Sequence, residues 1–293
     1  MCYCKLKFFK MHSLGNDFMI VLNNNFLPNK KTINLLANRK TAVGFDQLIV
    51  IKNNDNGKHC LVDIYNADGS QPETCGNGFR CVAFLIMQKF QTNSITISSA
   101  MHTAFCKKTS TGILVNMGQP KILWHEIPLR EKHNTAKLPI KIKGLGQPMC
   151  INIGNTHTVF FVDKNHKPTA NEMHHIGPYI EQHNLFPLGT NVHIACTLDN
   201  DTIAALTWER GSGLTNACGS GACAIGYLAY KNLNYSNKIN IKFINNIMNV
   251  LISEDNTVSC NAPASMSFFG SIDCTNDMLK SNRFEGSMYS SNT

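Results

Sequence analysis

Residues 75–81 read Cys-Gly-Asn-Gly-Phe-Arg-Cys, and residues 218–223 read Cys-Gly-Ser-Gly-Ala-Cys. Each stretch follows a Gly-Ser pair and a few turn-forming residues. Each then runs into an apolar segment that predicts a helix, over residues 75–89 and 218–231. The two leading cysteines lie 143 residues apart (218 − 75), close to half of the 293-residue chain. The sequence therefore indicates two related halves, each with a cysteine at the start of a helix.

The position of these two cysteines suggests acid–base chemistry. The start of a helix offers unpaired backbone N–H groups and the positive end of the helix dipole. Both favour a thiolate, so we expect the pKa of each thiol to be lowered. The same N–H groups can bind a carboxylate, and the glycines after each cysteine let a ligand approach closely. Each half is thus predicted to offer one thiol and one anion-binding cradle.

If the halves face each other, two thiols flank one bound molecule. One thiolate could remove a proton from one side of a carbon, while the opposite thiol delivers a proton to the other side. The aligned N–H groups would stabilise the negative charge that develops on the carboxylate. The predicted outcome is stereoinversion without a metal or an organic cofactor.

Other interpretations of the cysteines stay open at this point. A single buried cysteine is usually an inert core residue, and a redox pair would require the fold to bring distant thiols within disulfide reach. A phosphate loop is disfavoured because the expected Lys-Ser/Thr is absent. Zinc is also disfavoured, since the spacing of Cys218 and Cys223 has no matching second pair. A non-catalytic ligand-binding module is a further alternative.

The composition is typical of a globular protein in a reducing compartment. Hydrophobic residues make up 43%, and the longest apolar run, residues 81–87, is far shorter than the ~20 residues of a membrane span. The N-terminus lacks the apolar stretch of a secretory signal. Twelve cysteines are too sparse for a small disulfide scaffold, so free thiols and a cytoplasmic location are expected. The net charge of +8 comes from scattered basic residues, so no nucleic-acid binding is expected.

Strand-like and helix-like segments alternate irregularly along the chain. Besides the two apolar helices, residues 32–38 and 169–183 are predicted to be helical. The predicted strands are residues 5–9, 18–22, 47–52, 60–65, 95–99, 112–117, 154–162, 202–208, 238–244, 249–253 and 265–269. Residues 275–293 are polar and are predicted to form a disordered tail.

The two cysteine stretches resemble those of the diaminopimelate epimerase family, whose members are PLP-independent isomerases. The resemblance covers about residues 9–274. Further blocks carry it in order: residues 12–18 (HSLGNDF), 44–48 (GFDQL), 66–70 (NADGS), 154–157 (GNTH), 189–192 (GTNV) and 209–211 (ERG). One such block would be weak support, whereas all of them in sequence indicate membership.

The resemblance implies an α/β fold of the α+β type with two pseudo-symmetric domains. Each would be a mostly antiparallel sheet wrapped around a central helix, with the active-site cleft between them. We expect the first domain to span residues 1–118 and the second residues 119–261. The last strand, about residues 262–274, would pack back on the first half.

The resemblance also implies a role for each matching residue. Cys75 and Cys218 match the proton donor and acceptor pair. The positions that hold the reacting carboxylate through backbone N–H groups are Gly76, Asn77, Gly219 and Ser220. The residues near the reacting end or in substrate recognition are Asn16, Gln47, Asn66, Asn155, Asn191, Glu209 and Arg210. His157 and Glu209 match residues that tune the catalytic centre.

Physical chemistry supports two of these implied roles. Arg210 could form a charge-assisted contact with the distal carboxylate, and Glu209 could neutralise an ammonium group. Ser13, Thr156 and Leu214 depart from the usual family pattern, and the last departure removes a charge near the second cysteine loop.

The implied activity is interconversion of LL- and meso-diaminopimelate in lysine and peptidoglycan-precursor synthesis. The expected partner is a small amino-acid substrate, with a homodimer as one option for assembly. The alternative within the same fold is a proline or hydroxyproline racemase.

Overall fold

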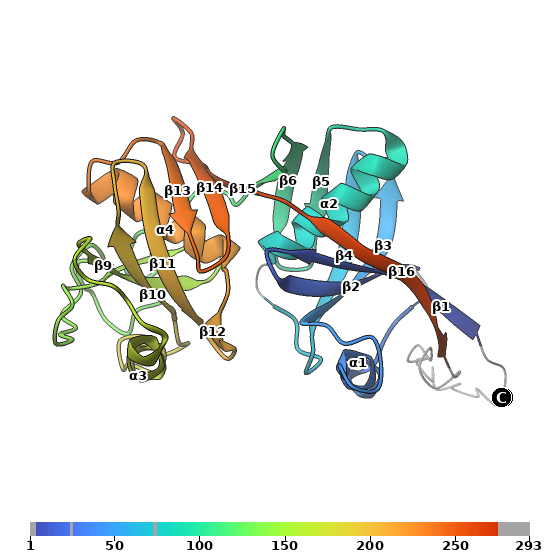
Figure 1. The fold of residues 1–293 in the computed structure, drawn as a ribbon, viewed down its shortest axis with the longest axis horizontal. Coiled ribbons are helices and arrows are strands. Elements are labelled where there is room, and N and C mark those ends of the chain that lie inside the picture. The colour runs from blue at the N-terminus through green and yellow to red at the C-terminus, as the bar shows by residue number, and fades with distance from the viewer. Residues whose placement is uncertain (1–3, 24–25, 73–74, 275–293) are drawn as a thin grey trace, which may run out of the picture.

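The computed structural model describes residues 4–23, 26–72 and 75–274, which form two lobes (Figure 1). The first part of the chain forms β1 (Cys4–Ser13), β2 (Asn16–Leu22), α1 (Lys30–Ala37), β3 (Gln47–Asp55), β4 (His59–Asn66), α2 (Gly76–Phe90), β5 (Ser94–Ser98), β6 (Thr103–Lys108) and β7 (Ile113–Asn116). The second part forms β8 (Met149–Asn152), β9 (Thr156–Val162), α3 (Ala170–Glu181), β10 (Asn191–Thr197), β11 (Thr202–Glu209), β12 (Gly213–Thr215), α4 (Gly219–Asn232), β13 (Lys238–Lys242), β14 (Ile247–Ile252), β15 (Val258–Ala262) and β16 (Ser265–Cys274).

Strand pairing is mostly antiparallel and runs without a break through both lobes. The parallel exceptions are β2–β3, β4–β5, β9–β10 and β11–β13. The two lobes join where β15 pairs with β7, and β16 then returns to pair with β1. Among the described residues there are four helices, so the predicted mixed α/β fold class is confirmed.

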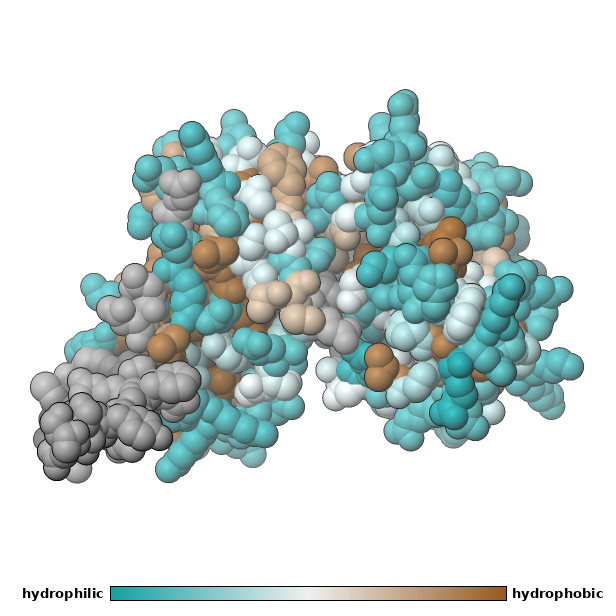
Figure 2. Space-filling model, turned by 180° about the vertical axis from the view of Figure 1, so that it is seen from behind, coloured by the Kyte–Doolittle hydropathy of each residue, from teal (hydrophilic) through white to brown (hydrophobic). Residues whose placement is uncertain are grey.

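The two lobes resemble each other in layout (Figure 1). α2 packs against β1, β5, β6 and β7, while α4 packs against β13, β14, β15 and β10. α1 and α3 lie at corresponding places at the edge of their lobes. Seen from behind, the surface is largely hydrophilic and the lobes meet at a narrow waist (Figure 2).

Both central helices are buried along most of their length, which agrees with their apolar sequence. Their side chains belong to one continuous hydrophobic core that also includes strands of both lobes. Gly226 lets α4 approach β14, because a Cβ there would lie 2.7 Å from Cγ1 of Val250. Within the described residues, no helix is long and apolar enough to cross a membrane.

Five strands were not predicted: β6, β8, β10, β12 and β15. β10 and β15 are buried along nearly their whole length, but they carry polar residues such as His193, Ser259 and Asn261. A strand buried on both faces shows no alternation, so its sequence lacks the period-two signal. The predicted domain boundaries at residues 118 and 261 stay a prediction, and residues 275–293 lie outside the described part.

Candidate active site

A cavity of about 1310 Å³ is lined by residues of both lobes. Twelve of the fourteen predicted site residues line it: Asn16, Gln47, Asn66, Cys75, Gly76, Asn77, Asn155, Glu209, Arg210, Cys218, Gly219 and Ser220. His157 and Asn191 are buried and do not line the cavity. The helix starts of α2 and α4 come close there, since a Cβ on Gly219 would lie 3.5 Å from Oδ1 of Asn77.

Cys75 caps the N-terminus of α2. The backbone N–H of Gly78 donates to its Sγ over 3.2 Å, and the thiol donates to Oε1 of Gln47 over 2.8 Å. Gln47 is held in turn by its Nε2, which donates to Oδ1 of Asn66 over 2.8 Å. A glycine is required at position 78, because a Cβ would lie 2.6 Å from Sγ of Cys75. The first thiol therefore faces a neutral amide.

Cys218 caps the N-terminus of α4 in the same way, but its neighbours differ. The N–H of Gly221 donates to Sγ over 3.4 Å, and Oγ of Ser220 lies 3.5 Å from the sulfur. The carboxylate of Glu209 also interacts with the thiol and raises its pKa. Oγ1 of Thr215 donates to Oε1 of Glu209 over 2.6 Å. The second thiol therefore faces a carboxylate.

The predicted lowering of the thiol pKa is wrong for this structure. The N–H donors at the helix starts are present and do lower the pKa of each thiol, but burial outweighs them. Burial raises the pKa of Cys75 to about 12, and the Glu209 charge adds to the rise while Gly78 and Arg80 oppose it. Burial also raises the pKa of Cys218 well above its usual value, as does the charge of Glu209. Both thiols are therefore protonated at neutral pH.

Glu209 lies on the cavity wall with a pKa that burial raises and that its interactions with Thr215 and Cys218 partly lower again. Arg210 follows it, and its Nη1 donates to the backbone oxygen of Leu188 over 2.7 Å. The N–H of Arg210 donates to Oδ1 of Asn191 over 3.1 Å. Asn191 therefore contacts the backbone of the Glu-Arg pair from behind the cavity.

His157 lies behind Asn155 in a chain of buried hydrogen bonds. Its Nε2 lies 2.7 Å from Oδ1 of Asn155, and its Nδ1 lies 2.8 Å from Nε2 of His193. Nδ1 of His193 lies 3.0 Å from Oγ1 of Thr207. Burial lowers the pKa of both rings, that of His193 to about 3, so both are neutral. Because the Asn155 oxygen accepts, His157 carries its proton on Nε2 and His193 donates from its own Nε2.

His193 was missed by the sequence reasoning. It lies on β10 and touches the start of α4, since a Cβ on Gly221 would lie 2.5 Å from its Cε1. In the sequence, the only feature that points to His193 as a site residue is its position directly after the family block at residues 189–192.

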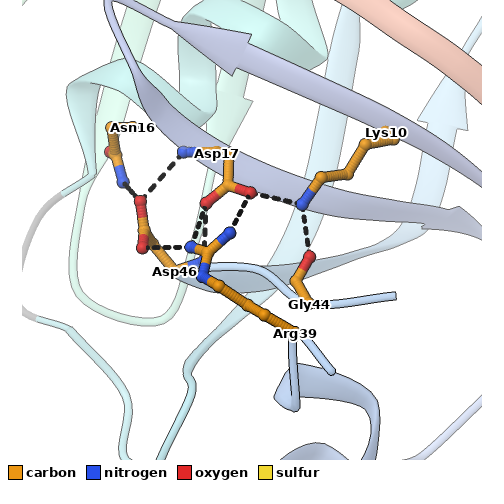
Figure 3. Close-up of polar contacts among 6 residues, drawn as sticks. All are labelled: Lys10, Asn16, Asp17, Arg39, Gly44 and Asp46. Carbon is orange, nitrogen blue, oxygen red and sulfur yellow. Dashed lines mark hydrogen bonds and ion pairs between the residues drawn. The ribbon is translucent and has the colours of Figure 1, made fainter. Parts of the chain in front are cut away.

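A group of charged residues borders the cavity near Asn16 (Figure 3). Arg39 donates to Asp17 from two nitrogens, over 2.8 and 2.6 Å, and to Oδ1 of Asp46 over 2.7 Å. Nδ2 of Asn16 donates to Oδ2 of Asp46 over 3.0 Å. Although burial opposes it, the hydrogen bonds from Arg39 and Lys10 hold the pKa of Asp17 well below its usual range.

This charged group joins two separate loops of the sequence. Lys10 on β1 contacts both Asp17 on β2 and the backbone oxygen of Gly44, so the β1–β2 hairpin is held to the loop that precedes β3. Gln47, which accepts from the thiol of Cys75, is the first residue of β3 and directly follows that second loop. Lys10 and Arg39 were not predicted, because their partners are distant in sequence.

The three departures from the family pattern have ordinary structural settings. Oγ of Ser13 donates to the backbone oxygen of Pro263 over 2.8 Å, and Oγ1 of Thr156 donates to that of Ile127 over 3.2 Å. Leu214 lines the cavity and packs against the second hydrophobic cluster. Among the described residues, no group of three or more His, Cys, Asp or Glu side chains could hold a metal ion.

Solved structures of other proteins share this fold. A phenazine biosynthesis protein of the PhzF family from Bacillus anthracis has a TM-score of 0.64 at 11% identity, and covers 92% of this chain and 99% of its own. A hydroxyproline epimerase from Agrobacterium vitis has a TM-score of 0.61 at 9% identity, and covers 92% of both chains. The chain thus has the fold shared by PhzF proteins and proline racemase-like isomerases.

The particular family follows from sequence comparison. The family model described as Diaminopimelate epimerase matches residues 8–123 and 149–266. The diaminopimelate epimerase of Zymomonas mobilis subsp. mobilis is 36% identical over 268 residues, 91% of this chain and 97% of that protein. That of Wolbachia sp. subsp. Drosophila simulans is 40% identical over 257 residues, 82% of this chain and 94% of that protein. The chain belongs to the diaminopimelate epimerase family.

Proposed function

We propose that this chain interconverts LL-2,6-diaminopimelate and meso-diaminopimelate by proton transfer between two thiols and the α-carbon, without a cofactor. The main support is the placement of Cys75 and Cys218. Each caps a central helix, the two helices come from different lobes, and both thiols line one cavity.

The proposed reaction has two proton transfers. One cysteine thiolate takes the α-proton, so a C–H bond breaks, an S–H bond forms and the electron pair moves into the carboxylate. The opposite thiol then gives its proton to the other face of the carbon, and an S–H bond breaks as the new C–H bond forms. No oxidant or reductant is needed, and the reverse reaction restores the starting protonation of the two sulfurs.

The neighbours of the two thiols suggest how one of them becomes a base. Glu209 interacts with Cys218 and has a pKa raised by burial, so it can accept the thiol proton. Cys75 donates to the neutral amide of Gln47, which cannot take up a proton at neutral pH. In this protonation state Cys218 acts as the base and Cys75 as the acid.

The substrate carboxylate would be held between the two helix starts. The first N–H groups of a helix have no acceptor within it, so those of Gly76, Asn77, Gly219 and Ser220 can donate to the carboxylate. Arg210 is proposed to bind the distal carboxylate. Glu209, which is neutral once it holds the thiol proton, is proposed to accept a hydrogen bond from the ammonium group through its carbonyl oxygen. Asn16, Asn66 and Asn155 would contribute amide contacts from the cavity wall.

Asn191 and His157 are proposed to act from behind the cavity, on Arg210 and Asn155 respectively. Neither would touch the substrate in this arrangement.

Incubation with LL-diaminopimelate in D2O tests the proposed activity. The expected result is meso product with deuterium on the inverted α-carbon. Proline and hydroxyproline run beside it as alternative substrates. Turnover of either one, with no exchange into diaminopimelate, would favour the racemase alternative. The 34–41% identity to diaminopimelate epimerases supports that alternative less well than the proposed activity.

We also propose that the protein works in the cytoplasm as a homodimer. Catalysis by two free thiols needs a reducing compartment. β16 ends the sheet and carries the exposed apolar side chains of Met266, Phe268 and Phe269, which a second copy could cover. Light scattering of the purified protein would show twice the mass of 32.5 kDa if this is correct and a single mass if it is wrong.

A further inference from the structure

The side chain of Arg80, one turn into α2, is fully buried with 0% of its surface exposed. Its nitrogens donate to Oγ of Ser13 over 3.0 Å and to Oδ1 of Asn77 over 2.6 Å. They also donate to the backbone oxygens of Ile113 over 3.3 Å and Cys260 over 3.4 Å. All four acceptors are neutral, and within the described part of the chain Arg80 forms no ion pair.

A buried guanidinium without a carboxylate partner is energetically costly. Arginine is almost never fully buried unless it is paired, because removing a charge from water is not offset by hydrogen bonds to neutral groups alone. A residue kept in such a position usually serves a purpose other than stability. The location of Arg80 indicates what that purpose is.

Arg80 lies directly behind the site where both helices begin. Its strongest contact is the side chain of Asn77, which lines the cavity and lies next to the position of Gly219 at the start of α4. Its acceptors come from β1, α2, β7 and β15, so it also joins the strands at the junction of the lobes. The positive charge therefore adds to the two helix dipoles that point at the cavity.

The charge of Arg80 affects the pKa of the thiols around it. It lowers the pKa of the Cys75 thiol against the stronger effect of burial. It acts in the same direction on the thiols that face it from α2, β6, α4 and β15, which are Cys81, Cys106, Cys223 and Cys260.

We infer that Arg80 is a positioning residue that supplies the countercharge for the amino-acid carboxylate bound between the starts of α2 and α4, and for the larger negative charge on it after proton removal. The inference rests on the proposed function for the identity of the anion. Arg80 acts through Asn77 and through its field, and does not itself touch the substrate.

The first test measures the thiol and does not depend on turnover. Cys75 is alkylated with iodoacetamide at ~pH 8, and the modified peptide is quantified by mass spectrometry in the wild type and in the R80M, R80Q and R80K variants. Because only the thiolate reacts, a loss of the charge should slow alkylation of Cys75 about tenfold in R80M and R80Q, while R80K stays within about threefold of the wild type. R130M, a change to a surface arginine, is the matched control and should have no effect.

The second test measures the effect on the substrate. In R80M and R80Q we expect KM for LL-diaminopimelate to rise and kcat to fall, by about tenfold each, with both largely restored in R80K. A purely structural role would lower the melting temperature of all three variants while leaving alkylation of the folded protein unchanged, and that result would overturn the inference.

If neither uncharged variant folds, R80K decides the question. Alkylation of Cys75 in R80K that is about tenfold slower than in the wild type would contradict an electrostatic role, because R80K keeps the charge, whereas a rate within about threefold of the wild type would support it. Slow alkylation in R80Q together with no deuterium exchange in the wild type would instead refute the proposed activity and leave the electrostatic role of Arg80 standing.

Discussion

The two thiol centres begin from the same short sequence and the same helix geometry, yet their surroundings differ. Cys75 donates to the amide of Gln47, whereas Cys218 interacts with the carboxylate of Glu209, which raises the pKa of its thiol. In both, the backbone N–H of the third helical residue donates to the sulfur. The repeated motif thus sets the position of each sulfur, and the neighbouring residues set which thiol has a carboxylate beside it to receive its proton.

The largest effect is expected when either thiol is removed. C75A and C218A should each lose epimerisation by about 10⁴-fold, because each face of the α-carbon needs its own acid or base. Each variant should still exchange the α-hydrogen of one stereoisomer with D2O, and the two variants should favour opposite stereoisomers. C196S, a change to a cysteine outside the cavity, is the control. Normal turnover in either alanine variant would refute the pairing.

The next effect should separate the two centres. E209Q keeps the hydrogen bond from Thr215 but cannot accept a proton from Cys218. We expect kcat to fall about 100-fold, with exchange at the Cys218 face slowed more than exchange at the Cys75 face. Stereospecific exchange followed by NMR measures this, with E254Q on the surface as the control. Equal slowing on both faces would show that Glu209 does not serve one thiol in particular.

A smaller effect is expected on the other side of the cavity. Q47L removes the acceptor of the Cys75 thiol without changing any charge, so kcat should fall about tenfold through loss of orientation. The pH dependence of kcat should stay as in the wild type. The matched control is Q88L on the exposed side of α2. A large shift of the pH profile in Q47L would mean that Gln47 tunes the thiol pKa as well as its position.

The smallest effect on activity, but a clear one on stability, is expected from the buried histidines. The pKa of His193 falls from 6.5 to about 3 on burial, so the unfolded chain binds more protons than the folded one below pH 6.5. The stability that the neutral ring contributes is therefore complete above pH 6.5 and is lost as the pH falls toward 3. At pH 4 the loss in the free energy of unfolding is on the order of 3 kcal/mol.

Urea unfolding between pH 7 and pH 4 measures this loss. H193Q, which keeps a hydrogen-bonding side chain without the ring titration, should show a weaker dependence on pH. An unchanged dependence would mean that other groups carry the acid sensitivity.

Much of the fold was predictable because it depends on local signals. α2 and α4 were predicted from continuous apolar sequence, and their first residues from the repeated glycines. β10 and β15 were not, since buried polar residues such as Asn261 hide a strand that is covered on both faces.

The site was predictable in its members but not in its electrostatics. The sequence places a thiol at each helix start, but burial, which raises the pKa of Cys75 to about 12, is a property of the whole fold. Arg80, His193 and Arg39 went unnoticed for a related reason: most of their partners lie far away in sequence and meet them only after folding.

The central claim is that two sulfurs act on opposite faces of one carbon, and the position of solvent label in early turnover tests it most directly. LL-diaminopimelate is converted in D2O to a few per cent, and the deuterium content of the meso product and of the recovered LL substrate is compared. Two-thiol catalysis predicts label in nearly all product and almost none in recovered substrate, since the group that takes the proton differs from the group that delivers deuterium. Equal early labelling of both would point to a single base and contradict it.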